Sequence, residues 1–330
     1  MKPKLVLLMA ALLALCVSTA FAGNPARIGS AGAQELRVPV GSRGTAMAGA
    51  VVANTYGIES MYWNPAGLAS LEGTAAMFSY LPYIADITQN FVGVATNIED
   101  FGTIGAGAKI MSVGDIEETT QAFPDGTGRI FSPSLAVINV TYAKVLTASV
   151  SFGATAMFIN ERIHEVSASG MAFDVGFLYN PGWKGVRMGL AIKNYGPEMQ
   201  FKGQGFERPL NSQRPASPNA QTFELPANIN IGMSYDFMDS GDNFASLGGN
   251  FVANTYSNDV IQGGFEYGYK GLYFLRGGYN YSRQDEWING ATLGAGLTYE
   301  MGETKVTFEY SWNQTDVFDD NQFFSVSMGF

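Results

Sequence analysis

Apolar and polar residues alternate along most of the chain after residue 73, in segments about ten residues long. Between residues 103 and 110, isoleucine and alanine occupy the even positions, whereas threonine, glycine and lysine occupy the odd ones. Successive side chains of a β-strand point to opposite faces, so a period of two predicts strands with one apolar and one polar face. The pattern predicts fourteen strands, at residues 74–81, 88–97, 103–112, 134–144, 148–160, 169–180, 185–194, 224–236, 244–253, 259–270, 272–281, 290–300, 304–313 and 322–330.

The links between these segments favour a closed barrel over a β-sandwich, which would alternate in the same way. Links such as 98–102 and 145–147 are short, whereas 113–133, 161–168 and 195–223 are longer. Short turns at one end and longer loops at the other are typical of outer-membrane barrels, and closure leaves no open sheet edge. The predicted fold is therefore all-β: a fourteen-stranded antiparallel transmembrane barrel over residues 73–330, surrounded by outer-membrane lipid. A soluble periplasmic β protein is the alternative.

The start of the chain predicts export. Lys2 and Lys4 precede a thirteen-residue apolar run, and a small-x-small pattern ends at Ala22, so residues 1–22 are expected to be a signal peptide. Cys16, the only cysteine, would leave with it. Without Lys2 and Lys4 the chain has 17 basic and 29 acidic residues, a net charge of −12. This balance argues against a nucleic-acid partner, because such a partner requires a basic surface.

One compact segment before the strands does not alternate. An Asn side chain can accept from a free backbone N–H of a helix's first turn, and Pro at the first helical position sets φ without losing a bond. Pro also disfavours helical backbone at the preceding residue. We expect two short helical pieces joined by an Asn-Pro corner, forming a lumenal plug within residues 23–72. The plug motif is Tyr62-Trp63-Asn64-Pro65-Ala66-Gly67-Leu68.

This motif and the glycine-rich stretch at residues 41–50 resemble the N-terminal region of PorV/PorQ-like proteins. That family belongs to the FadL-type outer-membrane superfamily. The resemblance implies a fourteen-stranded barrel in which residues 65–71 lie in the lumen and Asn64 anchors them. It also implies two functions. FadL members pass hydrophobic compounds such as long-chain fatty acids across the outer membrane. PorV members serve type IX secretion as shuttles for secreted cargo.

Charged residues at the polar positions of the strands are the candidate lumenal chemistry. Lys109, Arg187 and Arg276 are predicted to point inward, where each could hold a ligand carboxylate or an acid of the plug such as Glu59. Mutual pairing and hydration of a polar lumen is the simpler interpretation. Gly105 and Gly107 would allow either a strand kink that opens a lateral exit or the close approach of the plug.

The remaining residues predict no enzyme, metal site or cofactor. His164, the only histidine, lies in a loop with no nucleophile nearby, and the acidic stretches at 115–118 and 316–321 lack a fixed metal-ligand spacing. The expected function is passage of a hydrophobic or amphipathic small molecule across the outer membrane. The alternative is an outer-membrane component of type IX secretion, whose partners would be secretion machinery or cargo proteins.

Overall fold

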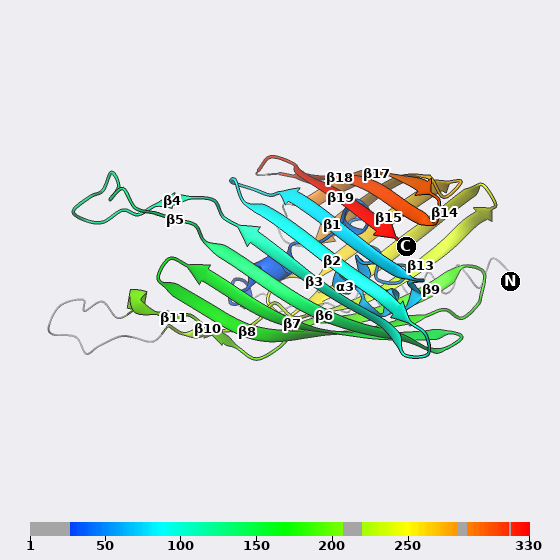
Figure 1. The fold of residues 1–330 in the computed structure, drawn as a ribbon, viewed down its shortest axis with the longest axis horizontal. Helices are drawn as coiled ribbons and strands as arrows, with labels where there is room; N and C mark the ends of the chain where they lie inside the picture. The colour runs from blue at the N-terminus through cyan, green and yellow to red at the C-terminus, as the bar shows by residue number, and fades with distance from the viewer. Residues whose placement is uncertain (1–26, 207–219, 283–288, 317) are drawn as a thin grey trace.

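The computed structural model describes residues 27–206, 220–282, 289–316 and 318–330 (Figure 1). The predicted signal peptide, residues 1–22, lies outside the described residues. Among the residues that are described, no helix is long and apolar enough to cross a membrane. The wall strands are β1 (Thr74–Pro82), β2 (Thr88–Ile98), β3 (Gly102–Ser112), β6 (Ser134–Thr147), β7 (Val150–Ile163), β8 (Val166–Tyr179), β9 (Val186–Tyr195), β13 (Asn228–Ser240), β14 (Asn243–Asn254), β15 (Val260–Tyr269), β16 (Tyr273–Ser282), β17 (Asn289–Met301), β18 (Thr304–Thr315) and β19 (Asn321–Gly329).

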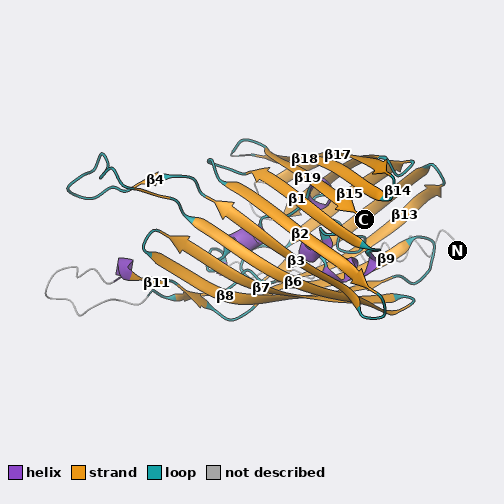
Figure 2. Cartoon of the chain, viewed as in Figure 1, coloured by secondary structure: helices purple, strands orange, loops and turns teal. Residues whose placement is uncertain are grey.

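These strands form a closed antiparallel barrel (Figure 2). Consecutive wall strands pair with each other, and β1 pairs with β19 from Ala75 to Tyr80, which joins the two ends of the sheet. The predicted fourteen-stranded barrel is therefore confirmed. Closure removes the unpaired edges that a flat sheet would expose to lipid.

The side-chain alternation has the inside-out sense of a membrane barrel. On β3, Thr103 and Lys109 point inward and are buried, whereas Ile104 and Ile110 point outward and are 36% and 50% exposed. Exposed isoleucine, phenylalanine and tyrosine side chains cover the outer surface of the other strands in the same way. A sandwich would bury its apolar face, so this arrangement places the apolar face against lipid.

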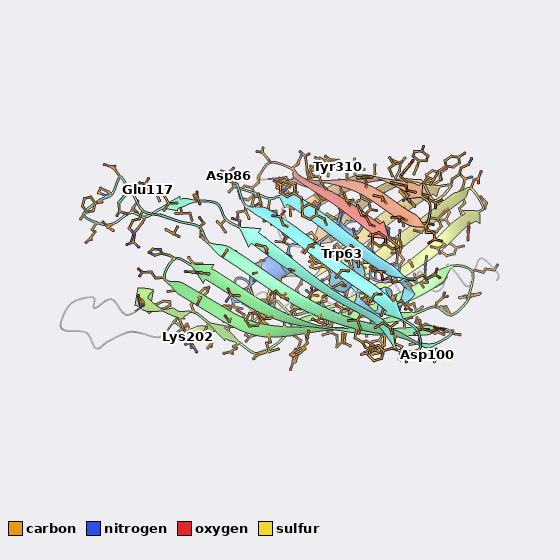
Figure 3. The ribbon with its side chains drawn as sticks, in the orientation of Figure 1. Trp63, Asp86, Asp100, Glu117, Lys202 and Tyr310 are labelled. Atoms are coloured by element: carbon orange, nitrogen blue, oxygen red, sulfur yellow. The ribbon has the colours of Figure 1, made fainter. Side chains whose placement is uncertain are left out.

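The two ends of the barrel differ, as Figure 3 shows through Asp100 and Glu117. Asp100 lies in the tight turn between β2 and β3, and Glu117 lies at the opposite end in a hairpin of β4 (Ile116–Glu117) and β5 (Ile130–Phe131). The segment between β9 and β13 also belongs to the Glu117 end, with β10 (Met199–Gln200), β11 (Lys202–Gly203), η4 (Gln204–Phe206) and β12 (Thr222–Phe223). Long loops face the cell exterior in outer-membrane barrels, so we call the Glu117 end the outer end.

One predicted loop is wrong. The expected link at 161–168 is a two-residue turn, because β7 runs to Ile163 and β8 begins at Val166. The run Glu161-Arg162-Ile163-His164-Glu165 is polar enough to suggest a loop, yet the strand continues. Glu161 points into the lumen, where it is buried. His164 then occupies the turn with φ 53°.

Inside the barrel lies the N-terminal segment, which contains η2 (Gln34–Arg37), α2 (Ser42–Ala46), α3 (Ser60–Trp63) and η3 (Pro65–Ser70). Its apolar side chains pack against inward-facing wall residues. Met61 and Leu68 contact Phe91 and Ala143 in one cluster, and Leu36 joins a second cluster around Ile159. The hydrophobic core of the protein therefore lies between the N-terminal segment and the wall. We call residues 33–71 the plug.

Candidate functional site: the lumenal plug and its attachment

The Asn64-Pro65 corner ties three parts of the chain together. Asn64 is extended (φ −159°, ψ 108°), as expected before proline, and it separates α3 from η3. Its side-chain oxygen accepts the Ala66 N–H at 3.2 Å. Its side-chain nitrogen donates to the carbonyls of Val52 at 2.8 Å and Phe177 at 3.2 Å. Since Phe177 belongs to β8, this one buried amide caps η3 and also attaches the plug to the wall.

The wall approaches the plug so closely that only glycine fits at the contacts. A Cβ on Gly176 would lie 2.0 Å from Asn64 Oδ1, and one on Gly153 would lie 2.3 Å from the Pro65 carbonyl carbon. Both distances are far below a normal non-bonded contact. We call the inward-facing glycines whose Cβ would meet plug atoms within 2.9 Å the glycine belt: Gly93, Gly105, Gly153, Gly176, Gly189, Gly248, Gly264, Gly278 and Gly294.

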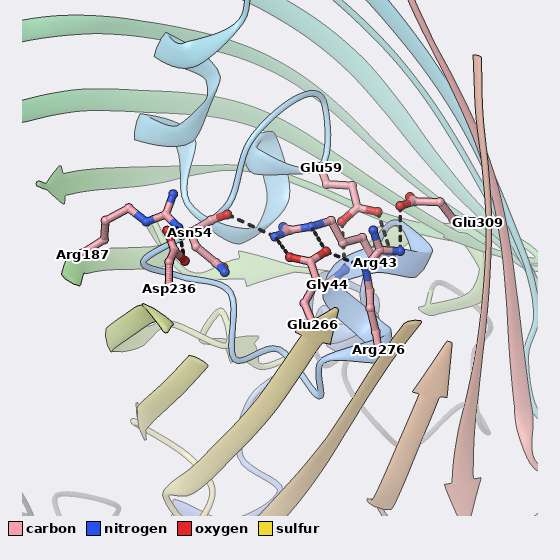
Figure 4. A network of polar contacts seen from close by, with 9 residues as sticks. All are labelled: Arg43, Gly44, Asn54, Glu59, Arg187, Asp236, Glu266, Arg276 and Glu309. Atoms are coloured by element: carbon pink, nitrogen blue, oxygen red, sulfur yellow. Dashed lines mark hydrogen bonds and ion pairs between the residues drawn. The ribbon is translucent and has the colours of Figure 1, made fainter. Parts of the chain in front are cut away.

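A buried ion network attaches the other side of the plug (Figure 4). Arg43 of α2 donates from Nε and Nη2 to the two carboxylate oxygens of Glu266 on β15, at 3.0 and 2.8 Å. Arg276 on β16 donates to the same carboxylate at 2.7 Å and pairs with Glu309 on β18 at 2.9 Å. Bidentate arginine–carboxylate pairs combine strength with geometric specificity. The plug therefore completes a network that begins on three wall strands.

Glu59 joins two plug elements beside this network. Its carboxylate accepts the backbone N–H groups of Arg43 at 3.1 Å and Gly44 at 3.0 Å. Burial and the nearby Glu309 carboxylate raise the pKa of Glu59, whereas Arg43 and the two N–H groups lower it, and together they bring it to about 7. Glu59 thus combines a structural role with titration near neutral pH.

Lys109 contacts the plug directly. Its ammonium on β3 donates to the backbone carbonyls of Glu35 at 2.7 Å and Val38 at 3.2 Å. Burial raises the pKa of Glu35, with Lys109 opposing that shift. Nearby, the Lys193 Nζ lies 3.5 Å from the centroid of the Tyr62 ring, a close cation–π contact. Lys109 thus donates to backbone carbonyls of the plug and forms no hydrogen bond with Glu59, the plug acid named in the prediction.

Arg276 and Arg187 pair with carboxylates of the wall. Arg276 bonds Glu266 and Glu309, so it reaches the plug only through the network. Arg187 on β9 pairs with Asp236 on β13 at 2.6 Å, apart from the Arg43 network (Figure 4). All three predicted lumenal cations thus have partners within the described residues.

Gly105 and Gly107 lie in a continuous ladder. β3 pairs with β2 and with β6 through both glycines without a change of register. A Cβ on Gly105 would lie 2.9 Å from the Met61 sulfur, and one on Gly107 would lie 2.6 Å from Asn139 Oδ1. A register shift occurs instead between β8 and β9, at Phe173 and Val175.

The sequence did not identify Arg43, and of the glycine belt it identified only Gly105. The carboxylate that Arg43 binds, Glu266, is 223 positions away in the sequence, so no local pattern identifies this pair. The sequence did contain a signal for the belt. Many of the 40 glycines fall on the polar face of their strands, although an ordinary strand does not require glycine at those positions. Glycine at such positions indicates close approach of another backbone.

On its outer side the plug bounds a cavity of about 440 Å³. Thr45, Gly49 and Trp63 of the plug line it, together with Tyr83 and Phe323. Wall residues around it lie at strand ends on the outer side, such as Asn228 at the start of β13 and Asn254 at the end of β14. A second cavity, of about 30 Å³, lies between Tyr62, Lys109, Asp174 and Lys193.

A closed barrel with an apolar outer face and a lumenal plug defines a transmembrane β-barrel of the outer membrane. Similar solved structures include the CymD monoaromatic hydrocarbon channel, with 15% identity, coverage of 89% of this chain and 98% of that one, and a TM-score of 0.55. The Pseudomonas putida toluene transporter TodX has 12% identity, 88% and 99% coverage and a TM-score of 0.56. A Pseudomonas aeruginosa FadL homologue has 13% identity, 88% and 98% coverage and a TM-score of 0.52.

These identities establish a shared fold and nothing further. The family follows from the sequence itself, because the profile described as "Type IX secretion system protein PorV" matches residues 26–253. The chain belongs to the PorV family, and the resemblance predicted from the Asn-Pro motif is confirmed. No curated protein matches the chain.

Proposed function

We propose that this barrel is an outer-membrane component of type IX secretion that holds or shuttles exported protein cargo. The observation that carries the proposal is the attachment of the plug to the wall. Asn64, the Arg43–Glu266 pair and the glycine belt fasten it on opposite sides. A barrel filled in this way serves as a rigid platform in the membrane, and membership of the PorV family supports that role. Neither binding nor shuttling requires covalent chemistry.

Passage of a hydrophobic or amphipathic molecule, such as a fatty acid, is the second candidate. It is favoured by the apolar residues that line the outer cavity, among them Met111, Val252 and Phe323. Onward movement would require the plug to leave the glycine belt and Arg43 to leave Glu266. Separating a buried bidentate pair costs about 3–5 kcal/mol, so a ligand would have to offset that cost. The attached plug therefore favours the first candidate.

Deletion of the gene separates the two candidates. If cargo handling is the function, exported proteins should disappear from the cell surface and accumulate in the periplasm, while uptake of a radiolabelled fatty acid stays unchanged. Surface-proteome mass spectrometry and the uptake assay measure the two outcomes in the same cells. Lost fatty-acid uptake with a normal surface proteome would reject the secretion proposal and support transport.

A further inference from the structure

The lumen has two chemically different layers. On β15, β16 and β18 the inward position deep in the barrel is charged, namely Glu266, Arg276 and Glu309. On each of these strands the inward position four residues nearer the outer end is a carboxamide, namely Gln262, Asn280 and Asn313. Four residues of strand span about 13 Å. The charged layer forms the ion network that attaches the plug, whereas the carboxamide layer lines the outer cavity.

The carboxamides form a hydrogen-bonded chain around the wall. Gln262 donates to Asn280 at 3.1 Å, and Asn250 donates to Gln262 at 2.7 Å. Asn250 also donates to Asn230 at 3.4 Å, which in turn donates to Asn228 at 2.5 Å. These bonds cross β16, β15, β14 and β13 in order. Each carboxamide has two donor hydrogens and two acceptor lone pairs, so a chain with one or two bonds per group leaves further donors and acceptors for a ligand.

Nine of the 25 residues that line the cavity are Asn or Gln, so uncharged groups that both donate and accept dominate its polar surface. Three lining residues are charged. The Lys193 Nζ lies against Tyr62 and Arg37 bonds Gln34 at 3.3 Å, whereas the Glu35 carboxyl is buried at the plug. Tyr83 and Trp63 add aromatic rings to the same surface. A volume of about 440 Å³ falls within the range of sites that bind small molecules.

We propose that this cavity is a binding site for a neutral saccharide presented from the cell exterior. Hydroxyl groups are donors and acceptors at once, which matches a surface of carboxamides. The apolar C–H faces of a sugar ring match the rings of Tyr83 and Trp63. A fatty acid would leave the carboxamides unpaired, and leaving buried polar groups unpaired is costly. The site is independent of the proposed secretion role, because cargo handling does not require it.

Two sources could supply such a ligand: a free oligosaccharide, or the polysaccharide on the surface of the same cell. Calorimetric titration of the purified barrel in detergent with maltotriose, cellotriose and chitotriose tests the first. Titration with polysaccharide released by mild acid from membranes of the source organism tests the second. A triserine peptide and octanoate serve as comparison probes, for an extended backbone and for a fatty acid.

The variants Gln262→Leu and Asn280→Leu remove the centre of the carboxamide chain. Each should weaken saccharide binding roughly tenfold or more, as expected for the loss of one or two hydrogen bonds. Asn97→Leu is the matched control, since Asn97 bonds Thr103 at 2.9 Å at the opposite end of the barrel. Its binding should stay unchanged. Heat-modifiable migration on gels establishes that each variant is folded.

Saccharide binding from either source that both cavity variants weaken would support the proposal. Absence of binding by every saccharide probe would overturn it, as would binding that the two variants leave unchanged. Binding of triserine or octanoate alone would also overturn it, in favour of a peptide or a fatty-acid site. Because none of these readouts involves secretion, a negative result leaves the proposed function intact.

Discussion

Arg43 of the plug and Glu266 of β15 are joined by two hydrogen bonds of 3.0 and 2.8 Å, although 223 positions separate them in the chain. Both side chains are almost fully buried, with exposures of 6% and 2%. The net attraction within a buried ion pair adds little to the free energy of unfolding. Removing one partner is costly, however, because it leaves the other charge buried without a counter-charge.

Replacing Glu266 with Gln should therefore lower the free energy of unfolding by about 3–5 kcal/mol, because Arg43 and Arg276 lose their shared carboxylate. Urea unfolding in lipid vesicles, followed by tryptophan fluorescence, measures the change. Glu300→Gln is the control, since Glu300 pairs with Lys305 at 3.0 Å on the exposed surface and should change stability by less than about 1 kcal/mol. Equal effects of the two substitutions would contradict the role of the network.

Asn64→Asp should loosen the plug while preserving its shape. Aspartate can accept from the Ala66 N–H but cannot donate to the Val52 and Phe177 carbonyls, so two buried acceptors lose their donor. The expected cost is about 1–3 kcal/mol for each unpaired group. Hydrogen exchange measured by mass spectrometry should speed up in residues 59–71. Asn160→Asp, at the exposed Asn160–Ser169 contact, should leave exchange in the plug unchanged.

Gly153→Ala tests the glycine belt. The new methyl group would lie 2.3 Å from the Pro65 carbonyl carbon, so the plug or β7 must move. Overpacking of this kind costs typically about 1–3 kcal/mol. Gly249→Ala on β14 is a matched control, because its methyl would meet no atom within 4 Å. Equal thermal stability of the two variants, judged by the temperature of heat-modifiable migration, would show that the wall does not press on the plug.

The raised pKa of Glu59 predicts that its contribution to the stability of the folded plug is larger in mild acid than at alkaline pH. Burial raises the pKa of Glu59 from 4.5 to about 7, so the folded state binds a proton that the unfolded state releases. This contribution to stability is fully present below pH 4.5 and is lost as the pH rises through about 7. The contribution of Glu59 to the free energy of unfolding, measured by urea unfolding in lipid vesicles, should therefore be larger at pH 5 than at pH 8.

Glu59→Gln should flatten this pH dependence, because glutamine does not titrate. Glu72→Gln, at an exposed position just beyond the plug, should preserve it. A pH profile that survives the loss of Glu59 would assign the effect to another group.

Two cysteines can test whether the plug must move. The Ser42 N–H donates to Ser325 Oγ on β19 at 3.2 Å, and both residues are buried. The double variant Ser42→Cys and Ser325→Cys places two thiols within reach of each other. If the barrel acts as a platform, oxidation should leave surface display of exported proteins unchanged. Loss of display on oxidation, with recovery on reduction and no effect in either single variant, would show that secretion requires plug movement.

Local patterns in the sequence determined the strands, their two faces and the corner at Asn64. Alternation with a period of two depends only on neighbouring residues, so Ile104 and Lys109 could be assigned to opposite faces without a structure. The Asn-Pro corner is equally local, because proline restricts the residue before it. The pattern was wrong around His164, where polar residues indicated a loop but the ladder continues with Glu161 facing the plug.

Tertiary structure alone decided which residues meet across the lumen. Arg43 finds Glu266, and Asn64 finds Phe177, only after the strands close with one particular register and tilt. The same register places Gly153 and Gly176 opposite the plug, and it gathers Gln262 and Asn280 at the outer end as one surface. Arg43 and Glu266 are 223 positions apart and Asn64 and Phe177 are 113 apart, so the geometry of these contacts depends on the whole barrel rather than on any segment of it.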